Sequence, residues 1–189
     1  RDYWTSFEGR AGASYSHSLG YVADDKTAES VSRTLEYAYD DWCVAQMAKD
    51  LGKTEDYNRL MQFSQNYRNQ YNAEKGFFLP RNYDGSWIDL DDHSRHGLTE
   101  GSKWTYLFCV LQDIPGMIDM MGGEKAFSAK LDRNFEEDHY RHDNEPGHHY
   151  IYLYNYCNEP WKTQELARKH VRINYKNSPD GVNGNDDCG

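Results

Sequence analysis

The strongest constraint on the fold is a helical repeat of apolar side chains between Ser30 and Gly52. Ser30 is a good N-cap and glycine often ends a helix, so the repeat predicts a helix of about 20 residues. Its apolar members are Val31, Leu35, Ala38, Tyr39, Trp42, Ala45 and Ala48, and Gln46 follows the same helical spacing. A helix with one apolar side has to bury that side against other elements, which favours a fold of packed helices.

Much of the remaining chain also predicts helices, separated by long loops. Helical patterns cover residues 54–71, 99–121 with a break at Pro115, 125–135, 148–156 and 160–175. Residues 1–28 have a loop pattern, and residues 76–87 predict two short extended pieces around an Asp-Gly turn. Helices and strands do not alternate, so the sequence predicts an all-α fold with irregular loops. The loops are rich in aromatic residues, which opposes disorder and favours a functional role.

Composition narrows the classes of ligand. The chain has 189 residues, the length of one domain or part of one, and includes 16 Tyr and 5 Trp. These side chains join flat apolar area to a polar group, which suits carbohydrate. The formal net charge of −10 argues against binding to the phosphate backbone of nucleic acids. No apolar run approaches the ~20 residues that span a bilayer.

The cysteines do not form a metal or redox motif. Cys43, Cys109, Cys157 and Cys188 lie far apart without a CxxC pair, and three of them fall in apolar helical patterns. We interpret them as small buried side chains rather than as disulfides or zinc ligands.

A first candidate for chemistry is Glu100, in the segment Thr99-Glu100-Gly101-Ser102-Lys103-Trp104. An acidic residue at a helix start is commonly there because the helix dipole favours it. The same residue can also project into a cleft, where an apolar wall would keep it protonated as a general acid.

A second candidate is the run from Asp143 to His149. Its oxygen ligands suit calcium better than zinc, because His148 and His149 are adjacent and lack the spacing of a zinc pair. The alternative is a capping turn, in which Asn144 and Glu145 satisfy free backbone donors.

A third candidate is the terminal Gly184-Asn185-Asp186-Asp187-Cys188-Gly189. It can be a calcium turn, the position of a catalytic base or a surface loop, and it lacks the spacing of an EF-hand. Two adjacent carboxylates between glycines, with no apolar residue after them, lead us to expect that the chain ends inside a functional loop. A missing signal peptide would then say nothing about the compartment.

Six segments in order closely resemble glycoside hydrolase family 92, the calcium-dependent exo-acting α-mannosidases. They are residues 32–46, 100–104, 144–149, 152–156, 160–164 and 179–189, and the resemblance runs from about Gly20 to the end. It implies an N-terminal β-sandwich followed by an (α/α)6 toroid. We expect residues 1–189 to be a fragment of that catalytic domain, without the sandwich, the first toroid helices and the helix after Gly189.

The resemblance also implies roles for individual residues. Glu100 matches the acid of the family's Glu-Gly-x-x-Trp segment, and Asp187 matches the base, with Asp186 as the neighbouring alternative. Asn144 and Glu145 match the segment at the sugar and the metal, so the implied Ca²⁺ ligands are Asn144, Glu145 and Asp187. Trp104 and His149 are further expected contacts of the sugar.

The chain departs from the family pattern at two positions. Asn185 stands where some members carry a second Asp, and Asp143 stands where the family usually has Gly after a His. The first departure bears on any shared base, and the second adds charge beside the expected metal loop.

The resemblance implies an inverting hydrolase that removes terminal α-linked mannose from mannan or N-glycans, with α-1,2 linkages as the first expectation. Many family members are exported by bacteria, so we expect a periplasmic or extracellular protein. The alternative function is a non-catalytic carbohydrate-binding helical module, in which Glu100 and Asp187 transfer no proton. We also expect these 189 residues to be inactive by themselves.

Overall fold

The computed structural model describes residues 9–184. They form two compact units, which are described separately. The boundary between them in the sequence lies between Gln112 and Asp113. No helix in the described part of the chain is long and apolar enough to cross a membrane.

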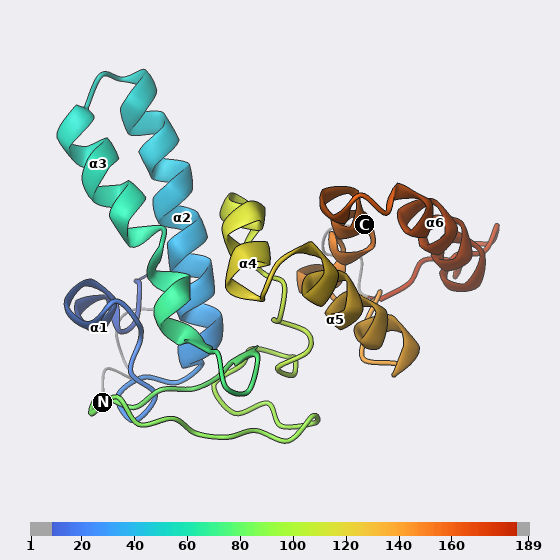
Figure 1. The fold of residues 1–189 in the computed structure, drawn as a ribbon, viewed down its shortest axis with the longest axis horizontal. Coiled ribbons are helices and arrows are strands. Elements are labelled where there is room, and N and C mark those ends of the chain that lie inside the picture. Colours follow the sequence, from blue (N-terminus) through green and yellow to red (C-terminus); the bar gives the residue numbers. More distant parts are fainter. Residues whose placement is uncertain (1–8, 185–189) are drawn as a thin grey trace. The chain divides into compact units, whose positions relative to one another are not determined.

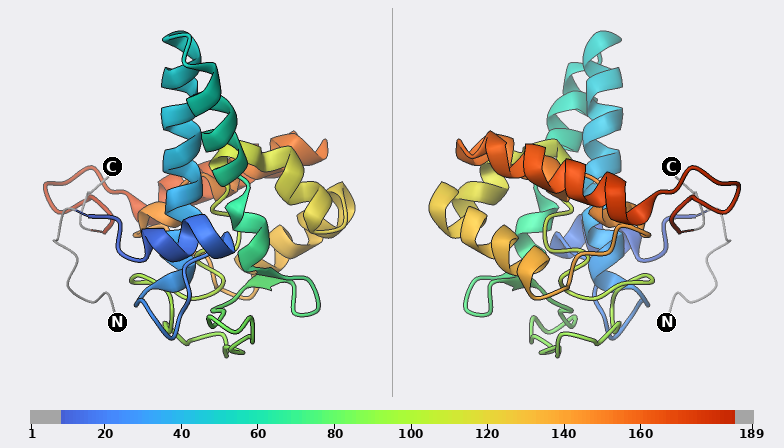
Figure 2. Two further views of the ribbon diagram at one scale, coloured as in Figure 1. Left: turned by 90° about the vertical axis from the view of Figure 1, so that its left-hand side faces the viewer. Right: turned by 90° about the vertical axis from the view of Figure 1, so that its right-hand side faces the viewer.

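A hairpin of two helices dominates the first unit (Figure 1). α2 (Ser30–Asp50) confirms the long helix predicted from the apolar repeat, and α3 (Thr54–Phe63) packs along it. Gly52 joins them with a φ of 68°, a left-handed conformation that glycine adopts without strain. Both views in Figure 2 show the hairpin projecting away from the loops that follow it.

The segment after α3 is irregular. The sequence predicted its extended pieces but not the early end of the helix. Instead of one helix to residue 71, the chain forms a 3₁₀ helix, η1 (Asn66–Gln70), and then two short strands. β1 (Tyr71–Asn72) pairs with the antiparallel β2 (Phe77–Phe78), in the register Tyr71 to Phe78. An isolated bridge joins Arg81 to Trp87, which confirms extended pieces around the Asp84-Gly85 turn.

Residues 1–28 were predicted to be a loop, but they contain α1 (Ala13–Leu19). This helix lies between Gly12 and Gly20, both left-handed, and buries only Ser16 among its own residues. Polar bonds hold it, since the Asn66 amide donates to the Ser16 carbonyl oxygen at 3.2 Å. A helix held by polar contacts leaves no apolar repeat in the sequence, which explains the wrong prediction.

The helix predicted from residue 99 is also absent. Residues 99–110 run through turns, and Trp104, Tyr106, Leu107, Phe108 and Val110 are all buried. A helix on a protein surface would expose some of these positions. An apolar run that is buried on every side does not reveal its secondary structure by periodicity.

The second unit begins at Asp113, the last residue of the short 3₁₀ helix η2 (Leu111–Asp113), and its first α-helix is α4 (Ile114–Met120). Pro115 was predicted to break a helix, but it lies in the first turn of α4, where a missing N–H costs nothing. The Asp113 carboxylate caps this helix by accepting from the Gly116 N–H at 3.0 Å.

The α-helices α5 (Glu124–Glu136) and α6 (Pro160–Asn174) confirm the helices predicted over residues 125–135 and 160–175. The helix predicted over residues 148–156 is instead a 3₁₀ helix, η4 (Tyr150–Cys157), and a second 3₁₀ helix, η3 (Glu145–Gly147), was not predicted. α5 and α6 both pack against η4. Lys162 of α6 reinforces this packing through ion pairs with Asp132 at 2.8 Å and Glu159 at 3.0 Å.

The cysteines are only partly as expected. Among the described residues, Cys43, Cys109 and Cys157 form no disulfide, and Cys157 is buried. Cys43 is exposed, so the prediction of a buried side chain is wrong there. It lies on a side of α2 that also exposes Val44 and Met47. Cys188 lies outside the described residues.

Candidate active site

Glu100 lies on the first unit in a tight loop rather than at a helix start. Its φ is 52°, in the left-handed region that residues other than glycine rarely occupy, and its side chain is exposed. The described residues therefore do not enclose this carboxyl in an apolar wall, and the acid role of Glu100 stays a prediction. An unusual backbone conformation at an exposed acid is typical of functional sites.

Gly101 permits the tightness of this loop. A Cβ atom at this position would lie 2.8 Å from both Cβ and Cγ2 of Thr105. The Thr105 hydroxyl in turn accepts from the Ser102 N–H at 3.1 Å. The close approach of the loop to Thr105 thus requires glycine at position 101.

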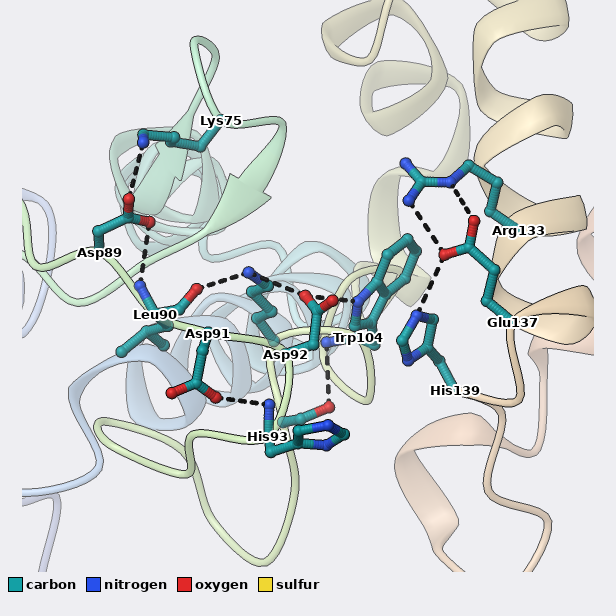
Figure 3. A network of polar contacts seen from close by, with 12 residues as sticks. Lys75, Asp89, Leu90, Asp91, Asp92, His93, Trp104, Arg133, Glu137 and His139 are labelled. Atoms are coloured by element: carbon teal, nitrogen blue, oxygen red, sulfur yellow. Dashed lines mark hydrogen bonds and ion pairs between the residues drawn. The ribbon is translucent and has the colours of Figure 1, made fainter.

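Trp104 packs in the interior and supports the loop that carries Glu100. It is 1% exposed and packs edge to face against Phe77, with 4.9 Å between ring centroids. Its Nε1–H donates to the Asp92 carboxylate at 3.1 Å (Figure 3). Asp92 also pairs with Lys103 at 3.0 Å. A ring that is already covered offers no face for a sugar, so this burial does not support the predicted substrate contact of Trp104.

The first unit holds a buried carboxylate that the sequence did not single out. Asp24 accepts from the Ser30 hydroxyl at 2.7 Å, and its other oxygen lies 2.6 Å from His96 Nε2. Its side chain is only 7% exposed. It joins the start of α2 to the loop that precedes Glu100. Nothing in the local sequence marks Asp24, because its partner His96 comes from a distant segment.

Asn144 and Glu145 lie in the second unit, at a tight turn that includes η3. The Gly147 N–H donates to the Asn144 carbonyl oxygen, and the His148 N–H donates to that of Glu145, each at 3.1 Å. Asn144 and Glu145 therefore do satisfy backbone donors, as the capping alternative requires, but with their main-chain carbonyl oxygens. Gly147 is buried, and a Cβ atom there would lie 2.9 Å from the Arg141 carbonyl oxygen.

Asp143, the departure from the family pattern, is neutralised by its neighbour. Arg141 contacts both carboxylate oxygens, with Nε at 3.0 Å and the terminal nitrogen at 2.8 Å. This hydrogen bonding from Arg141 lowers the pKa of Asp143. The negative charge added by Asp143 is thus balanced by an ion pair with Arg141 within the same turn.

His148 and His149 contact different partners. His148 Nε2 lies 3.2 Å from the His142 carbonyl oxygen, while the His149 ring meets Tyr150 edge to face. No group of three or more His, Cys, Asp or Glu residues that could hold a metal occurs in residues 9–184. Asn144 and Glu145 supply hard oxygen donors of the kind that Ca²⁺ prefers.

The terminal acidic turn begins beside this site. Gly184 packs on the backbone of Asp143, and a Cβ atom at Gly184 would lie 2.8 Å from the Asp143 carbonyl oxygen. The predicted base Asp187, its alternative Asp186 and the neighbouring Asn185 lie outside the described residues. The structure therefore brings the start of the third candidate segment to the second one.

A cluster of aromatic and imidazole rings lies behind the same turn. The Tyr140 hydroxyl is 2.8 Å from His142 Nδ1, and the Tyr175 hydroxyl is 2.9 Å from His142 Nε2. His170 stacks on His142 with ring centroids 5.7 Å apart. Sequence reasoning missed this cluster. The available signal was spacing, since the buried residues Thr163 and His170 of α6 lie two helical turns apart.

Comparison with known proteins identifies the relatives of this arrangement. Residues 1–189 match the model of the glycosyl hydrolase family 92 catalytic domain. An uncharacterized secreted glycosidase of Arthroderma benhamiae is 31% identical over 218 residues, which cover 97% of this chain and 28% of that protein.

Two solved structures from Bacteroides thetaiotaomicron share the fold. A family 92 α-mannosidase in complex with mannoimidazole is 38% identical with a TM-score of 0.87, over 93% of this chain and 26% of that one. A family 92 inverting mannosidase is 34% identical with a TM-score of 0.88, over 96% of this chain and 29% of that one. The chain therefore spans less than a third of the length of each relative.

Proposed function

Since this chain belongs to glycoside hydrolase family 92, we propose that the full-length protein hydrolyses terminal α-linked mannose residues. The resemblance noted in the sequence is confirmed by the family match and by the structural similarity to an α-mannosidase. The observation that carries the proposal is the left-handed, exposed Glu100 on a loop fixed by Gly101 and Trp104. It is an acid held in an unusual conformation with access to solvent.

In the proposed reaction Glu100 is the general acid. Its proton passes to the glycosidic oxygen as the bond from this oxygen to the anomeric carbon breaks, with the electron pair remaining on oxygen. Asp187, or Asp186 in its place, accepts a proton from the water that attacks from the opposite face. The product is mannose of inverted configuration. Such a mechanism needs carboxyl groups roughly 6.5–9.5 Å apart, so that a water molecule fits beside the sugar.

We propose that Ca²⁺ is bound by Asn144 and Glu145 together with Asp187. The donors fit a hard cation, and Gly184 supports the grouping because it lies against the backbone of Asp143 and precedes the acidic residues in the sequence. A calcium ion bound there would hold two vicinal hydroxyls of the terminal sugar. Asp143 is already paired with Arg141, so we do not include it among the ligands.

The finer proposals concern linkage, domain context and location. We propose α-1,2 mannosides of mannan or N-glycans as substrates, and an N-terminal β-sandwich that completes the protein beside the helical toroid. The relatives' greater length supports the second point. A periplasmic or extracellular location is supported by the secreted glycosidase among the relatives.

The direct test measures mannose release by the full-length protein from an aryl α-mannoside and from α-1,2-mannobiose. Glu100→Gln should lower kcat by about 10²- to 10⁴-fold, the usual contribution of a general acid. Glu55→Gln removes an exposed carboxyl from the first turn of α3 and should leave the rate unchanged.

Two further readouts test the remaining steps. A calcium chelator should abolish activity and added Ca²⁺ should restore it, while NMR of the first product formed should show the inverted anomer. Unchanged activity in Glu100→Gln would remove the acid assignment. Binding of mannobiose without any hydrolysis would favour the carbohydrate-binding module instead.

A further inference from the structure

The residue before Glu100 is held at both of its polar main-chain groups. The Thr99 N–H donates to the Ser32 hydroxyl oxygen at 2.8 Å. The Tyr106 hydroxyl donates to the Thr99 carbonyl oxygen, also at 2.8 Å. Both side chains are at least nine-tenths buried, and they come from different segments, since Ser32 lies in the first turn of α2.

These two bonds bear directly on the conformation of Glu100. The Thr99 carbonyl belongs to the peptide group that precedes Glu100, and the orientation of that planar group sets the φ angle of Glu100. That φ of 52° is unfavourable for a residue with a Cβ atom. Such a conformation persists only when its surroundings hold it. The Tyr106 hydroxyl supplies one such restraint from the side of Thr99, and the contact of Gly101 with Thr105 supplies another from the opposite side.

Ser32 and Tyr106 also interact with each other. Burial raises the pKa of Tyr106 to about 12, and its hydrogen bonds with Ser32 and Thr99 oppose the shift. The phenol therefore stays protonated at neutral pH and keeps its proton available for the Thr99 carbonyl. The Ser32 and Tyr106 hydroxyls and both main-chain polar groups of Thr99 therefore form one hydrogen-bonded network.

The rest of the loop is anchored to the same helix turn. The Gly97 carbonyl oxygen accepts from the Val31 N–H at 2.9 Å, which satisfies one of the free donors at the start of α2. A Cβ atom at Gly97 would lie 2.8 Å from Pro80 Cγ, so the loop is seated closely at this point. The start of α2 thus serves as a rigid base for the segment that carries Glu100.

We propose that Tyr106 and Ser32 are positioning residues for the general acid. They touch neither the sugar nor the reacting atoms, but fix the peptide group from which Glu100 projects. Productive proton transfer needs the acid within about 0.5 Å of its working position, and a displacement of about 1 Å can cost ~10²-fold in rate. This inference rests on the proposed role of Glu100 as the acid.

The test uses the full-length protein and two aryl α-mannosides that differ in their leaving group. 2,4-Dinitrophenolate leaves without protonation, whereas the phenyl mannoside depends on the acid. Tyr106→Phe keeps the ring and removes the hydroxyl. We expect kcat to fall about 10- to 100-fold with the phenyl mannoside and less than about 3-fold with the dinitrophenyl mannoside, with KM unchanged for both. A purely structural loss of folded enzyme would lower both rates equally.

The matched control is Tyr21→Phe. Tyr21 is as buried as Tyr106, at 5% exposure, and its hydroxyl also donates to a main-chain carbonyl, that of Asn82, at 2.9 Å. It should show no dependence on the leaving group. If Tyr106→Phe does not fold, Ser32→Ala removes the acceptor of the Thr99 N–H and is judged by the same comparison.

Glu100→Gln, measured in parallel, separates the two levels of the proposal. If it shows no dependence on the leaving group, the acid assignment itself fails. Glu100→Gln could instead slow the phenyl mannoside more than the dinitrophenyl mannoside, while Tyr106→Phe, or Ser32→Ala in its place, slows both substrates alike or neither. In that case Glu100 remains the acid and the positioning role is overturned.

Discussion

Gly184 lies against the backbone of Asp143 so closely that a Cβ atom at Gly184 would be 2.8 Å from the Asp143 carbonyl oxygen and 3.1 Å from its Cα. Gly184 opens the terminal acidic turn, and Asp143 directly precedes Asn144. The contact therefore joins two segments that the sequence indicated separately as parts of one sugar and metal site. It also needs glycine for a second reason, since Gly184 has a φ of 74°.

We expect Gly184→Ala in the full-length protein to lower kcat by at least about 10-fold and to weaken calcium binding. The methyl group would force the turn away from Asp143, and a shift of about 1 Å is enough to disturb catalysis. Titration calorimetry with Ca²⁺ and initial rates measure the two effects.

Gly52→Ala is the matched control for this prediction. Gly52 has a similar φ of 68°, but a Cβ atom there would meet nothing within 4 Å. It should cost about 1 kcal/mol of stability and leave the rate unchanged. Equal behaviour of the two variants would show that the contact with Asp143 has no functional role.

Acid should destabilise the second unit through His170. Burial, followed by repulsion from His142 and Lys169, lowers the pKa of His170. The unfolded chain takes up the proton near pH 6.5, whereas the folded chain resists it. The free energy of unfolding should therefore fall as the pH drops below about 6.5, until the lower folded-state pKa is passed.

Urea midpoints of the full-length protein at several pH values measure this effect. His170→Leu should make the midpoint depend less steeply on pH, because an apolar side chain suits a site that is 9% exposed. His93→Leu, at an exposed histidine, is the control and should keep the original slope. A slope unchanged in His170→Leu would contradict the prediction.

Trp104→Phe should destabilise the protein by about 1–3 kcal/mol. The variant loses the indole bond to Asp92 and leaves space against Phe77. Asp92 keeps its ion pair with Lys103, so no carboxylate is left alone. Urea unfolding and amide exchange in residues 97–106 measure the loss. Trp161→Phe, at a ring that is 57% exposed, should change stability by less than about 0.5 kcal/mol.

The 189 residues expressed by themselves should release no mannose and should bind a hydrophobic dye. α2 exposes Val44 and Met47, with Leu51 directly after it, and α6 exposes Trp161, Val171 and Ile173, so apolar helix faces meet water. The full-length protein at the same concentration is the control. Measurable turnover by the isolated piece would refute this expectation.

The sequence alone determined the parts of the fold that depend on local order. The apolar repeat predicted α2, and a proline at the first helical turn predicted the start of α6, because periodicity and capping are properties of neighbouring residues. The ordered motifs also identified the family, which the comparison with family models confirms.

Only the tertiary structure decided how the loops that carry the candidate site are held. Glu100 was expected at a helix start, yet its conformation depends on Ser32 and Tyr106, and the position of Gly184 depends on Asp143. None of these partners shares a periodic sequence pattern with the residue that it contacts. Long-range hydrogen bonds and close contacts leave no local pattern, and they override helix propensity where a segment is buried on all sides.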